Sequence, residues 1–194
     1  STDAAAVLVG VNRMFDLGFT KKELMERGVK LGADVPYCIM RGTALSEGIG
    51  EILTELPAPP QCHLVIAKPQ ISVSTKAVYG KLRVNELAPE EHPDIDGMMA
   101  AIKNGDLDGV IGRLGNVLET VTVPDHPEIS EIKEIMVENG ACGSLMSGSG
   151  PTVFGIYKDR ELAEKACQAL KEADGGRLTR QVYLTEFYNR KKAR

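Results

Sequence analysis

Asp34 is the only acidic residue in the stretch 31–42, LGADVPYCIMRG, and the residues after it are mostly apolar. An ionised carboxylate is costly to bury unless it is paired or hydrogen-bonded, so we expect Asp34 to have a specific role. It can cap the helix that Pro36 begins, or pair with Lys30 or Arg41. It can also act as a general base that accepts a proton from a substrate hydroxyl. The spacing alone favours the cap.

The segment 147–151, Ser-Gly-Ser-Gly-Pro, is a second candidate for chemistry, and we call it the glycine loop. It lies between two apolar, strand-like runs. Its glycines allow positive φ angles and a close approach to another surface, and its serines supply hydroxyl groups. The loop can be a hairpin turn, or it can be a loop whose N–H groups contact a nucleotide phosphate. The composition leaves both interpretations open.

The chain opens with three residues that suit a helix N-cap, Ser1, Thr2 and Asp3. Residues 4–15 follow with a helical pattern that is apolar on nearly every face, which predicts a mostly buried helix. A helix N-terminus attracts anions, and the hydroxyls of Ser1 and Thr2 could bind a phosphate, although a plain cap is the simpler interpretation. Because this helix begins at once, with no Met and no polar lead-in, we expect the chain to be a fragment.

Helical and strand-like patterns alternate along the rest of the chain. Helices are expected at residues 21–30, 74–82, 95–103, 107–114, 127–138 and 160–172. Strands are expected at residues 41–47, 51–55, 62–67 and 181–187, and on both sides of the glycine loop. The proline-rich stretch 56–61, LPAPPQ, is typical of a linker. The order predicts an α+β fold with one domain over residues 1–57 and a second, ferredoxin-like α/β sandwich over residues 58–194.

The composition limits the classes of partner. The net charge of −4 gives no electrostatic footprint for nucleic acid or for an anionic membrane. The four cysteines lack C-x-x-C spacing, which disfavours a zinc site or disulfide framework and favours a reducing, cytoplasmic location. No apolar run approaches the roughly 20 residues that span a bilayer. We expect a cytoplasmic monomer or homodimer that binds small molecules, with neither nucleic acid nor membrane as a partner.

Four segments of the sequence resemble the GHMP kinases. They are STDAAA at the start, LGADVPYCIMRGTALSEGIGE at 31–51, IAKPQISVSTKAVY at 66–79 and LMSGSGPTVFGIY at 145–157. In that family a glycine-rich phosphate loop precedes a long helix, and the first five residues here match the tail of that loop. The resemblance runs the whole length of the chain, and the segment at 31–51 is its most specific part.

The resemblance implies a two-domain kinase with its active site in the cleft between the domains. Residues 1–57 would be the second half of an ATP-binding N-terminal domain that is similar to the second domain of ribosomal protein S5. Residues 58–194 would be the C-terminal domain of the family. Most of the family's phosphate loop, and a lysine that partners its aspartate, have no counterpart in this chain. We therefore expect the chain to be inactive on its own.

The resemblance also assigns roles to individual residues. Asp34 matches the catalytic aspartate, which would accept the proton of an alcohol that attacks the γ-phosphate of ATP. The resemblance implies Mg²⁺ as well, but the sequence identifies no ligand for it. The ATP phosphates would be bound at two places, by Ser1, Thr2 and Asp3, and by Gly148, Ser149 and Gly150.

Two further residues match positions that line a substrate pocket. Thr75 and Tyr79 would surround a cytidine base, with the aromatic ring of Tyr79 stacked on it. The alternative for Tyr79 is that it fills the core beside Val78.

The implied reaction is phosphorylation of the free 2-hydroxyl of a methylerythritol unit in a cytidine diphosphate conjugate, a step of isoprenoid precursor synthesis. One alternative is another GHMP kinase that acts on homoserine, mevalonate or a sugar. The other is a non-catalytic module that has kept the fold.

Overall fold

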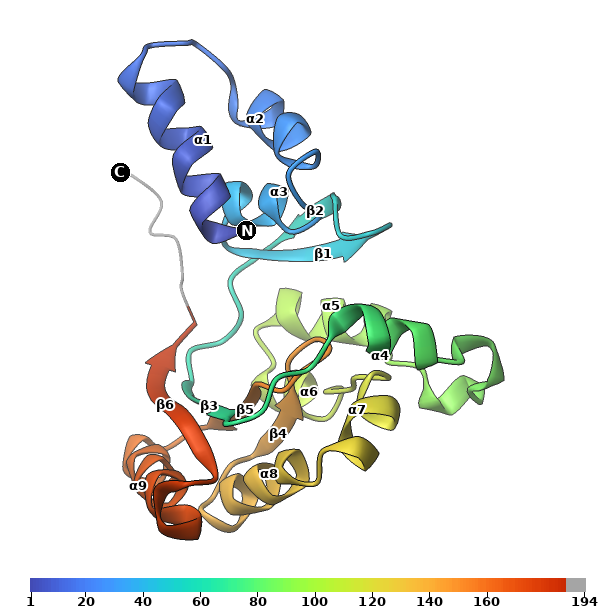
Figure 1. Cartoon of the computed structure of the whole chain (residues 1–194), viewed down its shortest axis with the longest axis vertical. Helices are drawn as coiled ribbons and strands as arrows, with labels where there is room; N and C mark the ends of the chain where they lie inside the picture. The colour runs from blue at the N-terminus through green and yellow to red at the C-terminus, as the bar shows by residue number, and fades with distance from the viewer. Residues whose placement is uncertain (188–194) are drawn as a thin grey trace. The chain divides into compact units, whose positions relative to one another are not determined.

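The structure is a computed structural model, and it describes residues 1–187. These residues form two compact units, residues 1–59 (unit 1) and 60–187 (unit 2) (Figure 1). The boundary between the units in the sequence falls within the proline-rich stretch 56–61. Each unit combines helices with a sheet, so the predicted α+β class is confirmed. The last seven residues of the second predicted domain, 188–194, lie outside the described residues.

Unit 1 is built from three helices and one hairpin within the described residues. They are α1 (Thr2–Met14), α2 (Lys21–Gly28), α3 (Val35–Met40), β1 (Thr43–Glu47) and β2 (Ile52–Leu56). The two strands are antiparallel and are joined by the Gly48-Ile49-Gly50 turn. The Thr20 hydroxyl accepts from the Glu23 N–H at 3.3 Å, and the Glu23 carboxylate accepts from the Thr20 N–H at 2.8 Å, which closes a capping box at the start of α2.

The prediction that the first helix is mostly buried is wrong for the described residues. Ala5 is the only residue of α1 in the buried class, and it packs with Leu24 of α2 and Ile39 of α3. Val7 and Met14 are 63% and 78% exposed. Within residues 1–187 the short helices α2 and α3 cover one stripe of α1, so the apolar pattern on its other faces remains open to solvent.

Unit 2 contains a four-stranded antiparallel sheet in the order β4-β5-β3-β6. Its strands are β3 (His63–Pro69), β4 (Gly143–Met146), β5 (Val153–Tyr157) and β6 (Thr179–Glu186). Its helices are α4 (Thr75–Lys81), α5 (Ile95–Asn104), α6 (Leu107–Ile111), α7 (Glu119–Asp125), α8 (Glu128–Glu138) and α9 (Arg160–Gly176). Two 3₁₀ turns, η1 (Val84–Glu86) and η2 (Pro89–Glu91), lie between α4 and α5.

The side chains of β3 alternate between the two faces of the sheet, as strand geometry requires. Val65 is fully buried in the larger core, with Ile132 of α8 and Leu170 of α9. Leu64 points to the opposite face and belongs to a smaller cluster that Ile111 of α6 packs against. Figure 1 shows α8 and α9 on the same side of the sheet. This two-sided packing fixes the positions of β4 and β5, which carry the glycine loop.

Candidate functional site

The glycine loop joins β4 to β5, so the hairpin interpretation is confirmed. The Ser147 N–H donates to the carbonyl of Thr152 at 2.8 Å, and the Gly150 N–H donates to the carbonyl of Ser147 at 3.0 Å. The Gly150–Pro151 peptide bond is cis. A hairpin does not exclude phosphate binding. Whether the loop can also bind a nucleotide phosphate depends on which of its N–H groups have no acceptor within the protein.

Two consecutive N–H groups of the loop are free. Those of Gly148 and Ser149 have no acceptor among residues 1–187. Gly148 has a φ of +57°, and a Cβ built on it would meet nothing within 4 Å, so this side of the loop is open. At Gly150, by contrast, φ is +84° and a Cβ would lie 2.6 Å from Sδ of Met146. Successive free N–H groups beside a left-handed residue form a concave site for an anion.

The structure brings Thr75 to this loop. The hydroxyls of Thr75 and Ser149 lie 2.9 Å apart, although the residues belong to distant parts of the sequence. Thr75 is the first residue of α4, and the Ser74 hydroxyl caps that helix by accepting from the Ala77 N–H at 3.4 Å. The predicted phosphate loop and one predicted substrate residue are therefore neighbours within unit 2.

Tyr79 lies one turn along α4 from Thr75, and residues four apart share one face of a helix. Its side chain is 61% exposed, whereas the neighbouring Val78 is 5% exposed and belongs to the core. The interpretation of Tyr79 as a core residue is therefore wrong. An exposed ring on the same face as Thr75 is free to contact a ligand.

Asp34 is exposed and not buried, so the expected burial cost does not arise. It occupies the N-cap position of α3, but its side chain accepts no capping hydrogen bond. Within residues 1–187 its carboxylate has neither a hydrogen-bond donor nor an ion-pair partner, so the predictions of a side-chain cap and of a pair with Lys30 or Arg41 are wrong there. Helix α3 begins here without a side-chain cap, because the ring of Pro36 already fixes a φ angle that suits the first turn of a helix.

Ser1, Thr2 and Asp3 form the N-terminal end of α1, as expected. Ser1 is the N-cap residue, and its side chain makes no capping hydrogen bond. The Thr2 hydroxyl lies 3.7 Å from Sγ of Cys38, which connects the start of α1 to α3. The first N–H groups of a helix have no partner inside the helix, so this end of α1 can donate to an anion. Unit 1 thus carries Asp34 and these three residues, and unit 2 carries the glycine loop, Thr75 and Tyr79.

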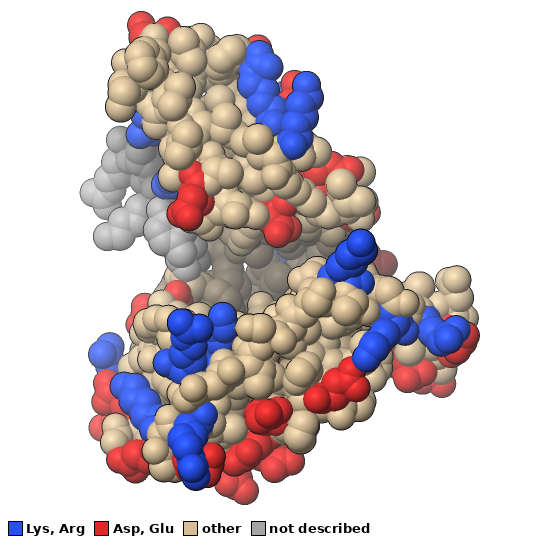
Figure 2. Space-filling model, in the orientation of Figure 1, with Lys and Arg blue, Asp and Glu red and all other residues tan. Residues whose placement is uncertain are grey.

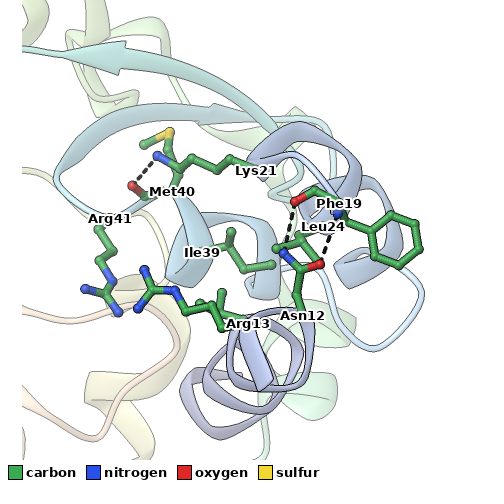
Figure 3. A pocket seen from close by; sticks show the side chains of 9 residues that line it. Asn12, Arg13, Phe19, Lys21, Leu24, Ile39, Met40 and Arg41 are labelled. Carbon is green, nitrogen blue, oxygen red and sulfur yellow. Dashed lines mark hydrogen bonds between the residues drawn. The ribbon is translucent and has the colours of Figure 1, made fainter. Parts of the chain in front are cut away.

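Unit 1 also contains a cavity of about 290 Å³ between α1, α2 and α3 (Figure 3). Its apolar wall includes Leu24 and Ile39, and Arg13 and Arg41 also line it, with side chains that extend toward the same side in Figure 3. Nζ of Lys21 donates to the carbonyl of Met40 at 2.7 Å at its edge. None of the predicted site residues lines this cavity. The sequence offered no signal for it, because its residues come from three separate helices and their flanking turns.

The described part of the chain contains no group of three or more His, Cys, Asp or Glu side chains that could hold a metal ion. Over the same residues there is no helix with the length and apolar character needed to cross a membrane. Figure 2 shows positive and negative side chains interspersed over the visible face of unit 2.

Residues 98–175 match the family model described as GHMP kinases C terminal. Over these residues the chain is similar to the C-terminal domain of GHMP kinases. The matched segment contains α7, α8, the glycine loop and all but the last residue of α9, so the match covers the segment with the free N–H groups. It begins inside α5 and leaves Asp34, Thr75 and Tyr79 outside the matched residues.

Curated relatives match nearly the whole chain. A protein of Lachnospira eligens is 55% identical over 188 residues, and one of Lachnoclostridium phytofermentans is 50% identical over 191 residues. Both are named 4-diphosphocytidyl-2-C-methyl-D-erythritol kinase. The matches cover 97% and 98% of this chain but 64% of each relative, so the chain spans just under two thirds of their length.

Solved structures of GHMP kinases share the fold. A crystal structure of 4-(cytidine 5'-diphospho)-2C-methyl-D-erythritol kinase has a TM-score of 0.75 at 28% identity, and covers 95% of this chain and 63% of its own. Homoserine kinase from Cytophaga hutchinsonii has a TM-score of 0.77 at 22% identity, over 94% of this chain and 64% of its own. The predicted GHMP-kinase-like fold is confirmed, and the second of these likenesses concerns the fold alone.

Proposed function

We propose that this chain is the larger part of an ATP-dependent kinase that phosphorylates the 2-hydroxyl of 4-diphosphocytidyl-2-C-methyl-D-erythritol. The names of the relatives at 48–55% identity support this choice of substrate. Because the chain spans just under two thirds of those relatives, we also propose that activity requires the part of the enzyme that lies outside the matched region.

The observation that carries the proposal is the pair of free N–H groups at Gly148 and Ser149, next to the Thr75 hydroxyl. A phosphate group needs several donors that converge on it, and two adjacent N–H groups with a neighbouring hydroxyl supply them. The open side of Gly148 leaves room for a ligand. In this proposal the glycine loop binds a phosphate of the nucleotide, and the start of α1 in unit 1 supplies further N–H donors.

Asp34 is proposed as the general base. During transfer, a bond forms between the substrate hydroxyl oxygen and the γ-phosphorus of ATP, and the bond from that phosphorus to the bridging oxygen of ADP breaks. The hydroxyl proton passes to the Asp34 carboxylate and then to water. Such transition states are loose, so positioning and charge stabilisation carry most of the catalysis, and the base contributes about 10²–10⁴-fold. An exposed carboxylate without a partner in residues 1–187 is free to accept this proton.

Thr75 and Tyr79 are proposed to bind the cytidine end of the substrate. They share one face of α4, and the Tyr79 ring is exposed there. Stacking of a base on an exposed aromatic ring is worth about 1–3 kcal/mol. Because Thr75 also contacts Ser149, a ligand on α4 and a phosphate on the glycine loop would be held by neighbouring groups.

Mg²⁺ accompanies ATP in reactions of this type, and the described residues contain no group of three or more His, Cys, Asp or Glu side chains that could hold it. Mg²⁺ is usually held by one or two carboxylates together with substrate phosphates and water. Bound in that way, it would neutralise charge on the transferred phosphoryl group.

The test uses a chimeric enzyme in which residues 1–194 replace the matched region of the Lachnospira eligens relative. We expect this chimera to phosphorylate the cytidine diphosphate conjugate, and Asp34→Asn to lower kcat by about 10²-fold or more with its fold intact. Asp16→Asn is the control, because Asp16 is an exposed carboxylate after α1 and has no proposed role. Undiminished turnover by Asp34→Asn would refute the role of Asp34. Phosphorylation of homoserine or mevalonate in preference to the conjugate would refute the substrate.

A further inference from the structure

Three residues with a spacing of three contact the backbone of the glycine loop or of Met146, the residue just before it. Asn116 lies in the turn before α7, and Glu119 and Thr122 lie on α7 itself. A spacing of three residues keeps side chains on one side of a helical segment, so all three can reach the same stretch of the chain. None of them was singled out by the sequence, because their partners lie about 30 positions further along.

Both polar atoms of the Asn116 side-chain amide form hydrogen bonds that hold the loop in place. Its Nδ2 donates to the carbonyls of Met146 and Gly148, at 2.8 Å each. Its Oδ1 accepts from the Leu118 N–H at 3.0 Å, which orients the amide. An amide nitrogen has two hydrogens, so one is used on the carbonyl before the loop and the other on a carbonyl within it.

Glu119 and Thr122 hold the two ends of the same segment. Oε1 of Glu119 accepts from the Met146 N–H at 2.7 Å, while Oε2 of Glu119 accepts from Nζ of Lys133 at 2.7 Å. The hydroxyl of Thr122, which is 1% exposed, donates to the carbonyl of Ser149 at 3.2 Å. The segment from Met146 to Ser149 is therefore held at both ends by side chains of one helix.

These contacts decide which way the free N–H groups point. In a trans peptide unit the C=O and the following N–H point in opposite directions. The carbonyl of Gly148 is directed to Asn116, so the Ser149 N–H in the same peptide unit points away from α7. The carbonyl of Ser147 accepts from the Gly150 N–H, so the Gly148 N–H is likewise turned away from that contact.

We infer that Asn116, Glu119 and Thr122 form a loop clamp that orients the Gly148 and Ser149 N–H groups toward a phosphate of the nucleotide. The inference rests on the proposed function, because it assigns the loop to nucleotide binding. The clamp residues are positioning residues: they act through the backbone of the loop and contact no reacting atom. Removing one of them should leave the fold in place and misdirect the two donors.

The orientation of the loop is tested first in the 194-residue chain, where no activity is needed. Asn116→Asp replaces the donating NH₂ by an oxygen that faces two carbonyls. Asn139→Asp is the matched control, because Nδ2 of Asn139 also donates to a backbone carbonyl at 2.8 Å, but to that of Ile135 in α8 and not to the loop. We expect the amide NMR shifts and exchange rates of Gly148 and Ser149 to change in Asn116→Asp and to stay unchanged in Asn139→Asp.

The consequence for nucleotide binding is tested in the chimeric enzyme. A misplacement of about 1 Å can cost about 10²-fold in rate, so we expect kcat/KM for ATP to fall about tenfold to a hundredfold in Asn116→Asp and Thr122→Val. Thr122→Ser retains the hydroxyl, so its kcat/KM for ATP should equal that of the wild type. Thr120→Val is the control, because the exposed Thr120 hydroxyl donates to the carbonyl of Val117 and not to the loop.

The two measurements separate the two ideas. Unchanged loop amides in Asn116→Asp would overturn the clamp, whatever the enzyme does. Changed loop amides with unchanged kinetics for ATP would overturn the assignment of the loop to nucleotide binding, and with it this part of the proposed function. If kcat/KM for ATP fell in Thr122→Ser as much as in Thr122→Val, the loss would not depend on the hydroxyl, and this would also overturn the clamp.

Discussion

The hydroxyls of Thr75 and Ser149 lie 2.9 Å apart and join the start of α4 to the loop between β4 and β5. Both side chains belong to residues that the sequence marked for binding, one for substrate and one for nucleotide. Either hydroxyl can donate, so the pair can reverse its direction when one oxygen contacts a ligand. The contact gives the two proposed binding regions a direct physical connection.

Removal of either hydroxyl should show this connection as a coupling free energy. We expect a double-mutant cycle of Thr75→Val and Ser149→Ala to give a coupling of about 0.5–1.5 kcal/mol in urea unfolding of the chain. Thr75→Ser retains a hydroxyl at the same position and should retain the coupling. A coupling indistinguishable from zero would mean that the hydrogen bond does not form in solution.

The capping box of α2 should stabilise that helix measurably. Thr20→Ala removes the oxygen that accepts from the Glu23 N–H, at a cost of about 1 kcal/mol. We expect amide hydrogen exchange in residues 21–28 to become about fivefold faster, since local opening follows the free energy of the helix. In Thr20→Ser, amide hydrogen exchange in residues 21–28 should be as slow as in the wild type. Equal exchange in Thr20→Ala would show that the box contributes little.

The core between α8 and the sheet should be sensitive to truncation. Ile132 is 0% exposed, so Ile132→Ala leaves a cavity and should lower the free energy of unfolding by about 2–5 kcal/mol. Val137 lies on the same helix and is 55% exposed, so Val137→Ala is the matched control, with an expected change below about 0.5 kcal/mol. Urea unfolding followed by circular dichroism measures both. Similar losses in the two variants would contradict this packing of α8.

The four cysteines are free and should differ strongly in reactivity toward iodoacetamide. Cys142 is exposed, whereas burial raises the pKa of Cys62 to about 11 and also raises that of Cys167. The thiolate is the reactive form, so at pH 8 Cys142 should be modified first, as mass spectrometry of the peptides will show. The raised pKa means that Cys62 favours the folded state below its unfolded pKa of about 8.5, and that this contribution is lost as the pH rises toward about 11. Modification of Cys62 as fast as Cys142 in the folded chain would contradict its burial.

Asp94 should make the stability of unit 2 depend on pH. Its carboxylate accepts from the Gly97 N–H at 2.9 Å and from Nε of Arg113 at 3.0 Å, and these contacts lower the pKa of Asp94. A lowered pKa stabilises the fold above the unfolded value of about 3.9, and this contribution is lost as the pH falls through the folded value. Asp94→Asn can still cap α5, so it should be less stable than the wild type at pH 7 and approach it near pH 2.

Urea unfolding across this pH range measures the difference between Asp94→Asn and the wild type. Arg113→Met provides the control, because it removes the cation and should reduce the pH dependence. A difference that stays constant from pH 7 to pH 2 would show that the charge of Asp94 does not contribute.

Features with short-range causes could be predicted from the sequence. The capping box at Thr20 and the hairpin turn at 48–50 depend on residues that are close together in the chain, and both are present. Helix α7 was not predicted, because it carries β-branched residues and an internal Pro124, which disfavour a helix locally. Burial of Thr122 against the core and the contact of Glu119 with Met146 outweigh that local preference.

The candidate site could be predicted only as separate pieces. The glycine loop and Thr75 were recognised one by one, but their contact spans 74 positions and left no pattern to detect. Asp34 was recognised for the wrong physical reason, since an apolar neighbourhood in sequence did not bury it. Its role as a base stays a prediction, as do those of the residues at the start of α1. Long-range packing, not local propensity, decides which side chains face solvent.

Strand β3 (His63–Pro69) pairs with β5 on one side and with β6 on the other, and β6 ends at Glu186. During synthesis, β3 leaves the ribosome long before either of its neighbours exists. Two of its side chains, Val65 and Ala67, then have no sheet to join until β5 has been made. The nascent chain must therefore keep an unpaired apolar strand from aggregating while residues 70–152 are made, which makes this segment a natural point of contact for a cellular chaperone.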